Sequence, residues 1–387
     1  MHSRDLIEQY KTYVQDWRRY FHKHPELSNE EFETTKTLAK ELESMGVEVH
    51  VDTDRGIGLI GIIHGSKPGK AIALRADIDA LPVHEHNAVD YKSEVEGKMH
   101  ACGHDFHQTS LLGAAELLKA MEEDLQGTIR LIFQPAEETS QGASQVLATG
   151  LLDDVVAIIG FHNMPQLKAG QLALKPGAMM AGVEKFKVTV EGVSSHAARP
   201  DLGVDTVLTL TSMIQNLQAL VSRTVSPFEP VVLSVTHIEA GATWNVLPQN
   251  GFFEGTIRCF NPDLQKRLKA DFIRIVEHTA GNFGAKATII WDQTPPVTYN
   301  DPELSELIFK NSQNIGELLP AQPSSAGEDF AFYQEKIPGV FAFIGSNGAA
   351  DAPDLHHDSM TIDDAAFQVS VPYYVENALF LLQHYKK

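Results

Sequence analysis

Cysteine is scarce in this chain of 387 residues, which contains only Cys102 and Cys259. Two cysteines cannot form the disulfide framework of a small secreted protein, so the sequence predicts a reducing compartment, the cytoplasm. Cys259 is interpreted as a small buried hydrophobic residue. Cys102 needs another explanation, because it lies in the densest group of histidines in a chain that has 17 of them.

Basic residues are outnumbered: 31 Lys and Arg stand against 51 Asp and Glu, which gives a formal net charge of −20. Nucleic acid and anionic membranes attract basic surfaces, so we expect neither as a partner. Apolar runs are short, and none approaches the ~18–20 residues of a membrane span. The first residues, MHSRDLIEQYK, are too polar for a signal peptide. These absences again favour a cytoplasmic protein with a small-molecule partner.

Several catalytic motifs are also absent. There is no HExxH helix, which excludes a thermolysin-like zinc site, and no Gly-x-Ser-x-Gly elbow, so a serine hydrolase has no support. The segment 65–70 is one residue short of a phosphate-binding loop, and Ala71 stands where Ser or Thr is required. His22 and His24 are interpreted as helix-end and turn residues rather than ligands.

The chain does contain an alternation of apolar strands and helices in its first half. This alternation predicts an α/β fold with a mostly parallel sheet flanked by helices. Ser28 or Asn29 is expected to cap the second helix. The predicted helices are 4–22, 30–46, 107–122 and 140–150, and the predicted strands are 71–74, 128–134 and 155–162.

The pattern changes near residue 180. Residues 185–191 alternate polar and apolar side chains, as a half-exposed strand does. Residues 183–294 are therefore predicted to form a smaller α+β domain inserted into the first, which comprises 1–182 and 295–387. The predicted elements of the insertion are helices at 204–223 and 262–282 and strands at 230–238, 251–259 and 286–291; a helix at 303–314 and a strand at 340–345 follow it.

Side chains of metal-ligand type follow several predicted strands. In open α/β sheets, ligands sit beyond the carboxyl ends of the strands. Thiolate, imidazole and carboxylate ligands together suit a borderline divalent ion such as zinc. The alternative is a set of unrelated surface histidines with one buried cysteine. The presence of metal-ligand side chains at four predicted strand ends argues against this alternative. The residues are Asp77, Cys102, His104, Glu137, Glu138, His162, His356 and His357.

Glu137 and Glu138 offer the division of labour of a metallohydrolase. One carboxylate binds metal, and its neighbour takes a proton from water. Alternatively, the pair merely caps the next helix, because carboxylates favour helix N-termini.

Ten motifs occur in order along the chain: FHKHPELSNEE (21–31), ALRADIDALPV (73–83), GKMHACGHDFH (97–107), FQPAEE (133–138), GFHNMP (160–165), GVSSHAARPDLGVDT (192–206), IEAGATWNVLPQN (238–250), GTIR (255–258), SAGEDFAFY (325–333) and LHHDSMTIDD (355–364). Together they resemble the amidohydrolase branch of the dinuclear-metal aminoacylase/carboxypeptidase superfamily. Relatives include hippurate hydrolases, indole-acetyl-amino-acid hydrolases, N-acyl-amino-acid amidohydrolases and N-acetyl-diaminopimelate deacetylases. The resemblance spans nearly the whole chain.

The resemblance implies a site for two divalent ions. By residue matching, Cys102 is the bridging thiolate, His104 and His162 bind one ion, and Glu138 and His356 bind the other. Relatives read Leu-His-Ser-Pro where this chain reads Leu355-His356-His357-Asp358, so His357 remains an alternative ligand. Glu137 matches the general base, and Asp77 matches a carboxylate that lies behind the metals.

The resemblance also gives the inserted domain a role as a lid, through which relatives form dimers. His196 matches a lid histidine that polarises the scissile carbonyl. Asn245 and Arg258 match positions that contact the substrate, although Arg258 could instead pair with an acid of the lid. A homo-oligomer through this domain is expected on the same ground.

The expected activity is hydrolysis of N-acyl-L-amino acids with two ions, zinc or manganese, and with cobalt or nickel as substitutes in vitro. N-acetyl-diaminopimelate deacetylase and metallo-dipeptidase or carboxypeptidase activity are the alternatives on the same site. A non-catalytic binding protein is the alternative of another class, and the intact Glu137 argues against it.

Overall fold

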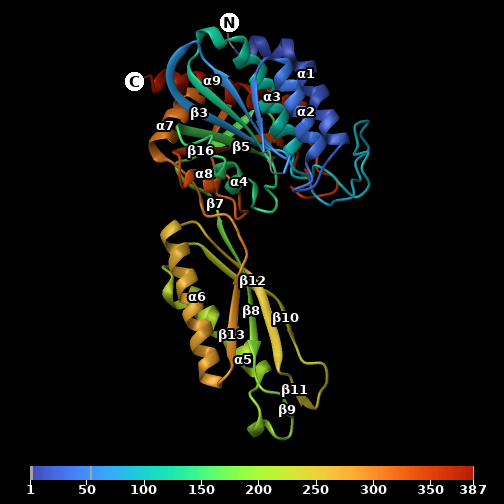
Figure 1. The fold of residues 1–387 in the computed structure, drawn as a ribbon, viewed down its shortest axis with the longest axis vertical. Helices are drawn as coiled ribbons and strands as arrows, with labels where there is room; N and C mark the ends of the chain where they lie inside the picture. Colours follow the sequence, from blue (N-terminus) through green and yellow to red (C-terminus); the bar gives the residue numbers. More distant parts are fainter. Residues whose placement is uncertain (1–2, 53–54, 387) are drawn as a thin grey trace. The chain divides into compact units, whose positions relative to one another are not determined.

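The computed structural model of the chain describes residues 3–52 and 55–386, with side chains from residue 11 onward. Residues 1, 2, 53, 54 and 387, which the predicted first domain includes, lie outside the described residues. The fold divides into two compact units (Figure 1). Unit 1 comprises Met1–Met179, Tyr299–Gln322 and Asp329–Lys387, and unit 2 comprises Met180–Thr298 and Pro323–Glu328. The segment 323–328 thus belongs to unit 2, whereas the prediction assigned it to the first domain.

Unit 1 is built on an eight-stranded sheet. Its centre, in the order β4-β3-β5-β16, is parallel throughout, while β1 and β2 add an antiparallel edge. At the other edge, β6 runs antiparallel to β16, and β15 lies parallel to β6. The sheet confirms the predicted fold class. The strands in spatial order are β1 (Glu48–Val51), β2 (Leu59–His64), β4 (Gln126–Gln134), β3 (Lys67–Asp77), β5 (Val155–Lys168), β16 (Gly339–Asn347), β6 (Gln171–Leu174) and β15 (Glu317–Pro320).

Helices cover both faces of this sheet. Alternate residues of β3 show the two faces: Leu74 packs in the main core with residues of α3 and α9, whereas Arg75 lies under the ring of Phe330, next to α8. The helices α1 (Ser3–Lys23), α2 (Phe32–Ser44), α3 (His104–Ala120) and α9 (Phe367–His384) form the first layer, and α4 (Gly142–Ala148) and α8 (Ala331–Gln334) lie on the other face; α7 (Pro302–Asn311) packs beside α9 and β16.

The predicted caps of the second helix are wrong. Glu31 occupies the N-cap of α2 and makes no side-chain cap hydrogen bond. The Ser28 hydroxyl instead donates to Oδ2 of Asp79 (2.6 Å), and Asn29 adopts a left-handed backbone with φ 67°. The chain therefore uses this turn to support a carboxylate at the end of β3 rather than to start the helix.

Unit 2 is a four-stranded antiparallel sheet with helices packed on one face. The apolar residues of one face, including Phe186, Val188 and Phe253, form a core with Phe272 of α6 and Leu210 of α5. The opposite face carries polar side chains such as Lys187 and Glu254 together with exposed apolar ones such as Val232 and Ile290. The strands in spatial order are β10 (Val231–Ala240), β12 (Asn250–Cys259), β8 (Gly182–Glu191) and β13 (Lys286–Trp291), and the helices are α5 (Thr206–Ala219) and α6 (Pro262–Phe283).

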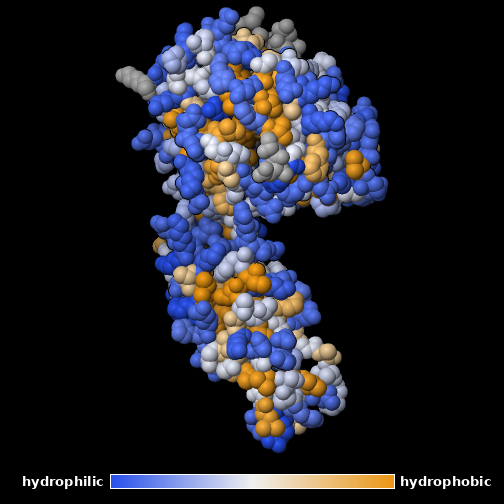
Figure 2. Space-filling view, viewed as in Figure 1, coloured by the Kyte–Doolittle hydropathy of each residue, from blue (hydrophilic) through white to orange (hydrophobic). Residues whose placement is uncertain are grey.

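Two small ribbons complete the fold. The strands β9 (Ser195–His196) and β11 (Val246–Leu247) pair at one end of the unit 2 sheet, and β7 (Gly177–Met180) pairs with β14 (Thr298–Asn300) where the chain passes between the units. Figure 2 shows apolar side chains among hydrophilic ones on the visible surface of unit 2. Among the described residues, no helix combines the length and the apolar character needed to cross a membrane.

Candidate metal centre

The predicted metal ligands gather at one edge of the unit 1 sheet. The parallel strands β3, β4 and β5 end in the same direction, which brings Asp77, Glu138 and His162 to neighbouring positions. The helix α3 starts with His104, directly after Cys102 and Gly103, and is buried along most of its length. The segment that follows β16 contributes His356.

The donor atoms fall into two groups that share Cys102. One group comprises Cys102, His104 and His162, and the other comprises Cys102, Glu138 and His356; within each group all donor atoms lie within 4.8 Å of one another. The Cys102 sulfur lies 3.4 Å from Nε2 of His162, and Nε2 of His356 lies 3.4 Å from Oε1 of Glu138. Two ligands of a tetrahedral ion with bonds of about 2.1–2.3 Å are separated by about 3.5 Å, so these distances fit two donors of one ion.

His356 rather than His357 belongs to these groups. The ring of His357 accepts a hydrogen bond from the Ser359 backbone and lies 3.1 Å from Asp358. It is part of no donor group among the residues the structure describes. The backbone of His356 is left-handed, with φ 64°, and its N–H donates to the carbonyl of Ala101 (2.9 Å), which brings the segment up to the Cys102 turn.

Buried polar atoms without partners point into the cluster. Nδ1 of His104 donates to the Asp79 carbonyl (2.9 Å), while its Nε2 is buried and makes no hydrogen bond. Oε1 of Glu138 is likewise buried without a hydrogen bond. In His162, Nδ1 donates to the Asn163 carbonyl (2.8 Å), so that Nε2 is left to face Cys102. Burial of such polar atoms without a partner costs free energy in an apolar interior, and divalent ions bound to them would supply the missing partners.

The charges of the cluster also fit cations. Burial raises the pKa of the Cys102 thiol well above its usual value, and the nearby Glu138, Glu137 and Asp77 add to the effect. Burial lowers the pKa of His104, but Asp77, Asp79 and Glu138 outweigh burial and raise this pKa to about 10. Burial lowers the pKa of His162 well below its usual value, so this imidazole is neutral. Bound cations would lower the pKa of Cys102 and of His104, because they favour the thiolate and the neutral imidazole.

Glu137 lies beside this cluster and does not cap a helix. Its Oε1 accepts a hydrogen bond from the Asp329 backbone (3.4 Å). The preceding Ala136 has a left-handed backbone, φ 53°, and donates its N–H to Glu31 (2.7 Å). The next helix, α4, begins only at Gly142 and has Gln141 as its N-cap. The capping alternative is therefore wrong, and the turn holds Glu137 and Glu138 at the strand end.

Asp77 lies behind the cluster in a buried network that the sequence did not reveal. Its Oδ1 accepts from Nδ1 of His107 (2.6 Å), and its Oδ2 accepts from Arg75 (2.8 Å) and lies 3.7 Å from Nε2 of His104. His107 in turn accepts the backbone N–H of Asn163 (2.9 Å). The motifs contain Asp79, His107 and Asn163, but nothing in their spacing shows that they orient His104, Asp77 and the Cys102 turn.

The predicted substrate residues lie in unit 2 and are not together. His196 is exposed in β9, and the backbone carbonyl of Asn245 accepts from Ala197 (3.1 Å), so these two are neighbours. Arg258 is half-buried in β12 and donates to the Ser325 carbonyl (2.9 Å). Within the described part of the chain it has no carboxylate within 4.0 Å, so the proposed pairing with a lid acid does not occur. Arg258 lies near one end of β12, whereas His196 and Asn245 lie beyond the other.

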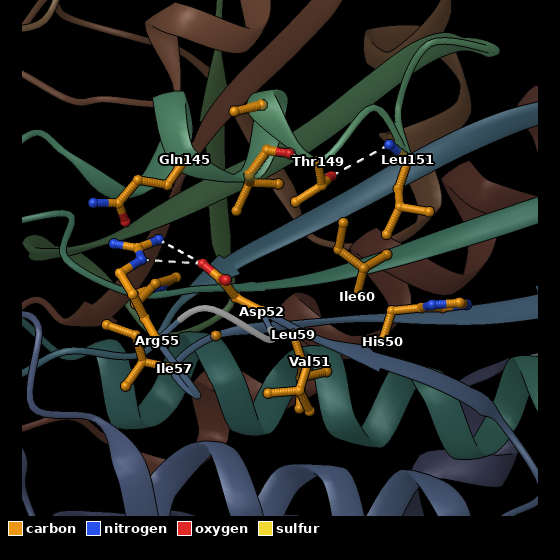
Figure 3. A pocket seen from close by; sticks show the side chains of 14 residues that line it. His50, Val51, Asp52, Arg55, Ile57, Leu59, Ile60, Gln145, Thr149 and Leu151 are labelled. Carbon is orange, nitrogen blue, oxygen red and sulfur yellow. Dashed lines mark hydrogen bonds and ion pairs between the residues drawn. The ribbon is translucent and has the colours of Figure 1, made fainter.

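A cavity of about 710 Å³ lies elsewhere in unit 1, between the strands β1 and β2 and the helix α4 (Figure 3). Its polar feature is the Arg55 guanidinium, which donates twice to Oδ2 of Asp52 (2.7 and 3.1 Å). The residues that line it include none of the predicted ligands or catalytic groups. The donor cluster, rather than this cavity, therefore contains the residues predicted to bind metal.

Comparison with known proteins agrees with this site. The sequence profile of the peptidase family M20/M25/M40 matches residues 73–376. An N-acetyl-L-cysteine deacetylase of Bacillus subtilis (strain 168) is 43% identical over 366 residues, which cover 94% of this chain and 87% of that protein. IAA-amino acid hydrolase ILR1-like 5 of Arabidopsis thaliana is 41% identical over 353 residues, covering 87% and 80%. The structure of the Bacillus subtilis YXEP protein, a dinuclear metal binding peptidase from the M20 family, matches with a TM-score of 0.85 at 37% identity, covering 97% of this chain and 99% of that one.

Proposed function

Because the chain belongs to the peptidase family M20/M25/M40, we propose that it hydrolyses the amide bond of N-acyl-L-amino acids and releases a carboxylate and a free amino acid. It is a metal-dependent amidohydrolase of this family. The similarity to deacetylases and amino acid hydrolases carries the substrate class, and the observation that carries hydrolysis is the pair of donor groups that share Cys102, with a second carboxylate, Glu137, beside them. A protein that only binds its ligand has no need of that extra carboxylate.

The proposed ligands follow the two donor groups. Cys102 would be shared by both ions, His104 and His162 would hold one of them, and Glu138 and His356 would hold the other. Asp77 stands behind His104. Thiolate and imidazole favour zinc by their softness, and manganese is the alternative for the carboxylate-bearing site. The need for a free thiolate is also the reason to place the protein in the reducing cytoplasm.

The residues around the ions have distinct tasks. Divalent ions in such a site lower the pKa of bound water towards neutrality and polarise a carbonyl oxygen. Glu137, steered by the Asp329 N–H, takes a proton from the attacking water as its oxygen bonds to the acyl carbon. When the C–N bond breaks, Glu137 passes that proton to the leaving nitrogen. His196 is proposed to donate a hydrogen bond to the carbonyl oxygen, a contribution of about 3 kcal/mol in comparable sites.

Asn245 and Arg258 are the proposed substrate contacts, and Arg258 suits a carboxylate because a guanidinium can donate two parallel hydrogen bonds. One copy of unit 2 cannot place Arg258 and His196 on one small molecule: the rise of β12 from Asn250 to Arg258 alone is about 27 Å at ~3.4 Å per residue. A substrate that meets both residues therefore requires two copies of the chain.

The test is a substrate panel on protein reconstituted with zinc, manganese or cobalt. We expect hydrolysis of N-acetyl-methionine, hippurate or another N-acyl-amino acid to exceed hydrolysis of dipeptides. Preferential turnover of dipeptides or of N-acetyl-diaminopimelate would replace the proposed substrate class with one of these. Fewer than one ion per chain, with no hydrolysis of any substrate, would indicate a binding protein.

Glu137→Gln is expected to keep both ions and to lower kcat by several orders of magnitude, because the amide cannot accept the proton of water. Glu138→Gln is the matched comparison at the next residue, and we expect it to lose an ion. Metal content by elemental analysis and kcat on the best substrate of the panel check both variants. Near-parental turnover by Glu137→Gln would mean that another group is the base.

A further inference from the structure

The segment that carries His356 has little regular structure of its own. Between β16 and the final helical turns, residues 348–363 contain no helix or strand. The left-handed backbone of His356 is unfavourable for a residue with a side chain, by about 1 kcal/mol or more, so its surroundings must hold it. Contacts with other parts of the chain must fix the position of the ligand.

Three backbone carbonyls of the segment, at every second residue, each accept a hydrogen bond from another part of unit 1. Asp358 accepts from the N–H of His86 (2.8 Å), Met360 from Nδ2 of Asn87 (3.0 Å), and Ile362 from Nη1 of Arg18 (3.0 Å). The side chains of Met360 and Ile362 are buried in the core. The segment is therefore held over five residues directly after the proposed ligand.

Two of these donors, Asn87 and Arg18, belong to one network of buried charges that reaches the first turn of α3. Asn87 also donates to Oε1 of Glu85 (3.0 Å), which accepts from Nε2 of His22 (3.1 Å). Nδ1 of His22 donates to Oδ2 of Asp105 (2.9 Å), and Nε of Arg18 donates to the same oxygen (3.3 Å). Asp105 follows His104 in the first turn of α3.

The network is buried and carries charges of both signs, and Arg18 also pairs with the partly exposed Asp364 (2.8 Å). Arg18, His22, Glu85 and Asp105 are each at least 97% buried. Arg18 and His22 are cationic and Glu85 and Asp105 anionic, since the two carboxylates outweigh burial and raise the pKa of His22 to about 9. Charges buried in this way hold one another in place strongly, because removal of one leaves another uncompensated. The distance between the first turn of α3 and segment 358–362 is thus fixed by polar contacts.

We propose that Arg18 and Asn87, connected through His22, Glu85 and Asp105, are positioning residues that set the affinity of the ion held by Glu138 and His356. The inference rests on the two-ion centre proposed above. It predicts an unequal effect: loss of the network moves His356, whereas His104 and His162 keep their own supports in the carbonyls of Asp79 and Asn163.

Asn87→Ala is the principal test, because it removes one segment contact without stranding a buried charge. Titration of metal-free protein with zinc, against a competing chelator, gives the two dissociation constants. We expect Asn87→Ala to weaken one ion by about 10–100-fold and to leave the other unchanged. His356→Ala identifies the affected ion. Arg18→Ala should shift the same constant, with a larger cost in stability.

Asn311→Ala is the matched control: Asn311 is also half-buried in unit 1 and donates to a backbone carbonyl, that of Glu376 (3.1 Å). Asn311→Ala should leave both zinc dissociation constants unchanged. A general loss of stability should not weaken the binding of one ion more than that of the other. If the parent binds two ions, and Asn87→Ala and Asn311→Ala have the same two zinc dissociation constants, this inference is wrong while the proposed two-ion centre stands. Fewer than two ions in the parent would overturn the proposed centre and this inference with it.

Discussion

Cys102 is the residue on which both halves of the centre depend. Its sulfur is the one donor common to the two groups, and its side chain is 6% exposed. Cys102→Ser replaces a soft, readily ionised donor with a hydroxyl that stays protonated. We expect both ions to weaken by about 100-fold or more, since loss even of an outer partner costs about 10–100-fold.

Cys259→Ser is the matched control for that prediction. Cys259 is equally buried, but it lies in the core of unit 2 and not in a donor group of the described residues. Zinc titration should therefore show weaker binding of both ions in Cys102→Ser than in Cys259→Ser. Equal affinity in Cys102→Ser and Cys259→Ser would remove the thiolate from the centre.

The sequence predicts the residues that face the ions better than those that support them. Cys102, His104, Glu138 and His162 lie within recognisable motifs at the start of α3, after β4 and in β5, and the parallel order of the strands brings them together. The supports Asp79, His107 and Asn163 act through buried contacts between distant segments, which no local spacing records. The choice between His356 and His357 depends on which ring reaches Cys102 and Glu138 in the folded chain, which two adjacent residues of the same type cannot reveal.

At the scale of elements, the turn into α3 is the critical connection. Gly103 has φ 88°, and a Cβ added there would lie 2.5 Å from Oδ1 of Asn163. Asn163 is fully buried and fixed by His107, so it cannot move aside. Gly103→Ala should cost about 1–2 kcal/mol of backbone strain and about 1–3 kcal/mol of overpacking, and should weaken both ions.

Gly97→Ala separates the two costs. Gly97 precedes the same turn and has a similar φ of 71°, but a Cβ there would meet nothing within 4 Å. Gly97→Ala should lower the free energy of unfolding only by the backbone strain, about 1–2 kcal/mol. Urea unfolding of the metal-free variants measures the difference. A Gly103→Ala variant no less stable than Gly97→Ala, with unchanged zinc affinity, would contradict the argument.

Helices and strands in which apolar residues recur at one regular spacing were predictable from the sequence, and those without such a spacing were not. The helix predicted over 262–282 is observed as α6, Pro262–Phe283, because its apolar stripe faces the unit 2 core. In contrast, α9 is buried on nearly every side and contains Pro372, so its sequence carries no amphipathic pattern and no helix was predicted there. The short strands β6 and β15 were missed because a few residues carry too little period.

At the scale of the whole molecule, unit 2 exposes a sheet edge and apolar side chains. Among the described residues no further strand pairs with its edge strand β10, and apolar side chains on β10 and α5 are exposed: Val207, Leu208, Val232 and Ile238 are each 41–50% exposed. Such edges and patches favour pairing with another chain. We expect the protein to form a homo-oligomer through unit 2, and light scattering should give a multiple of 42.6 kDa.

Leu208→Glu should dissociate this oligomer, because it places a charge in the apolar contact. Phe309→Glu is the control, as Phe309 is a comparably exposed apolar residue (38%) of unit 1. Only the first variant should lower the mass in solution. A parent with the mass of one chain would show that the exposed face has another role.

The donors of the two ions are spread unequally along the chain. Cys102, His104 and His162 lie within 60 residues, whereas Glu138 and His356 are separated by more than half of the sequence, with all of β8 to β13 between them. Each doubling of a loop adds about 0.6 kcal/mol to the entropy cost of closing it, so the second pair costs about 1 kcal/mol more to bring together. His356 follows β16, which lies between β5 and β6 in the sheet. We therefore expect a refolding chain to complete the group of Cys102, His104 and His162 before the group that needs His356.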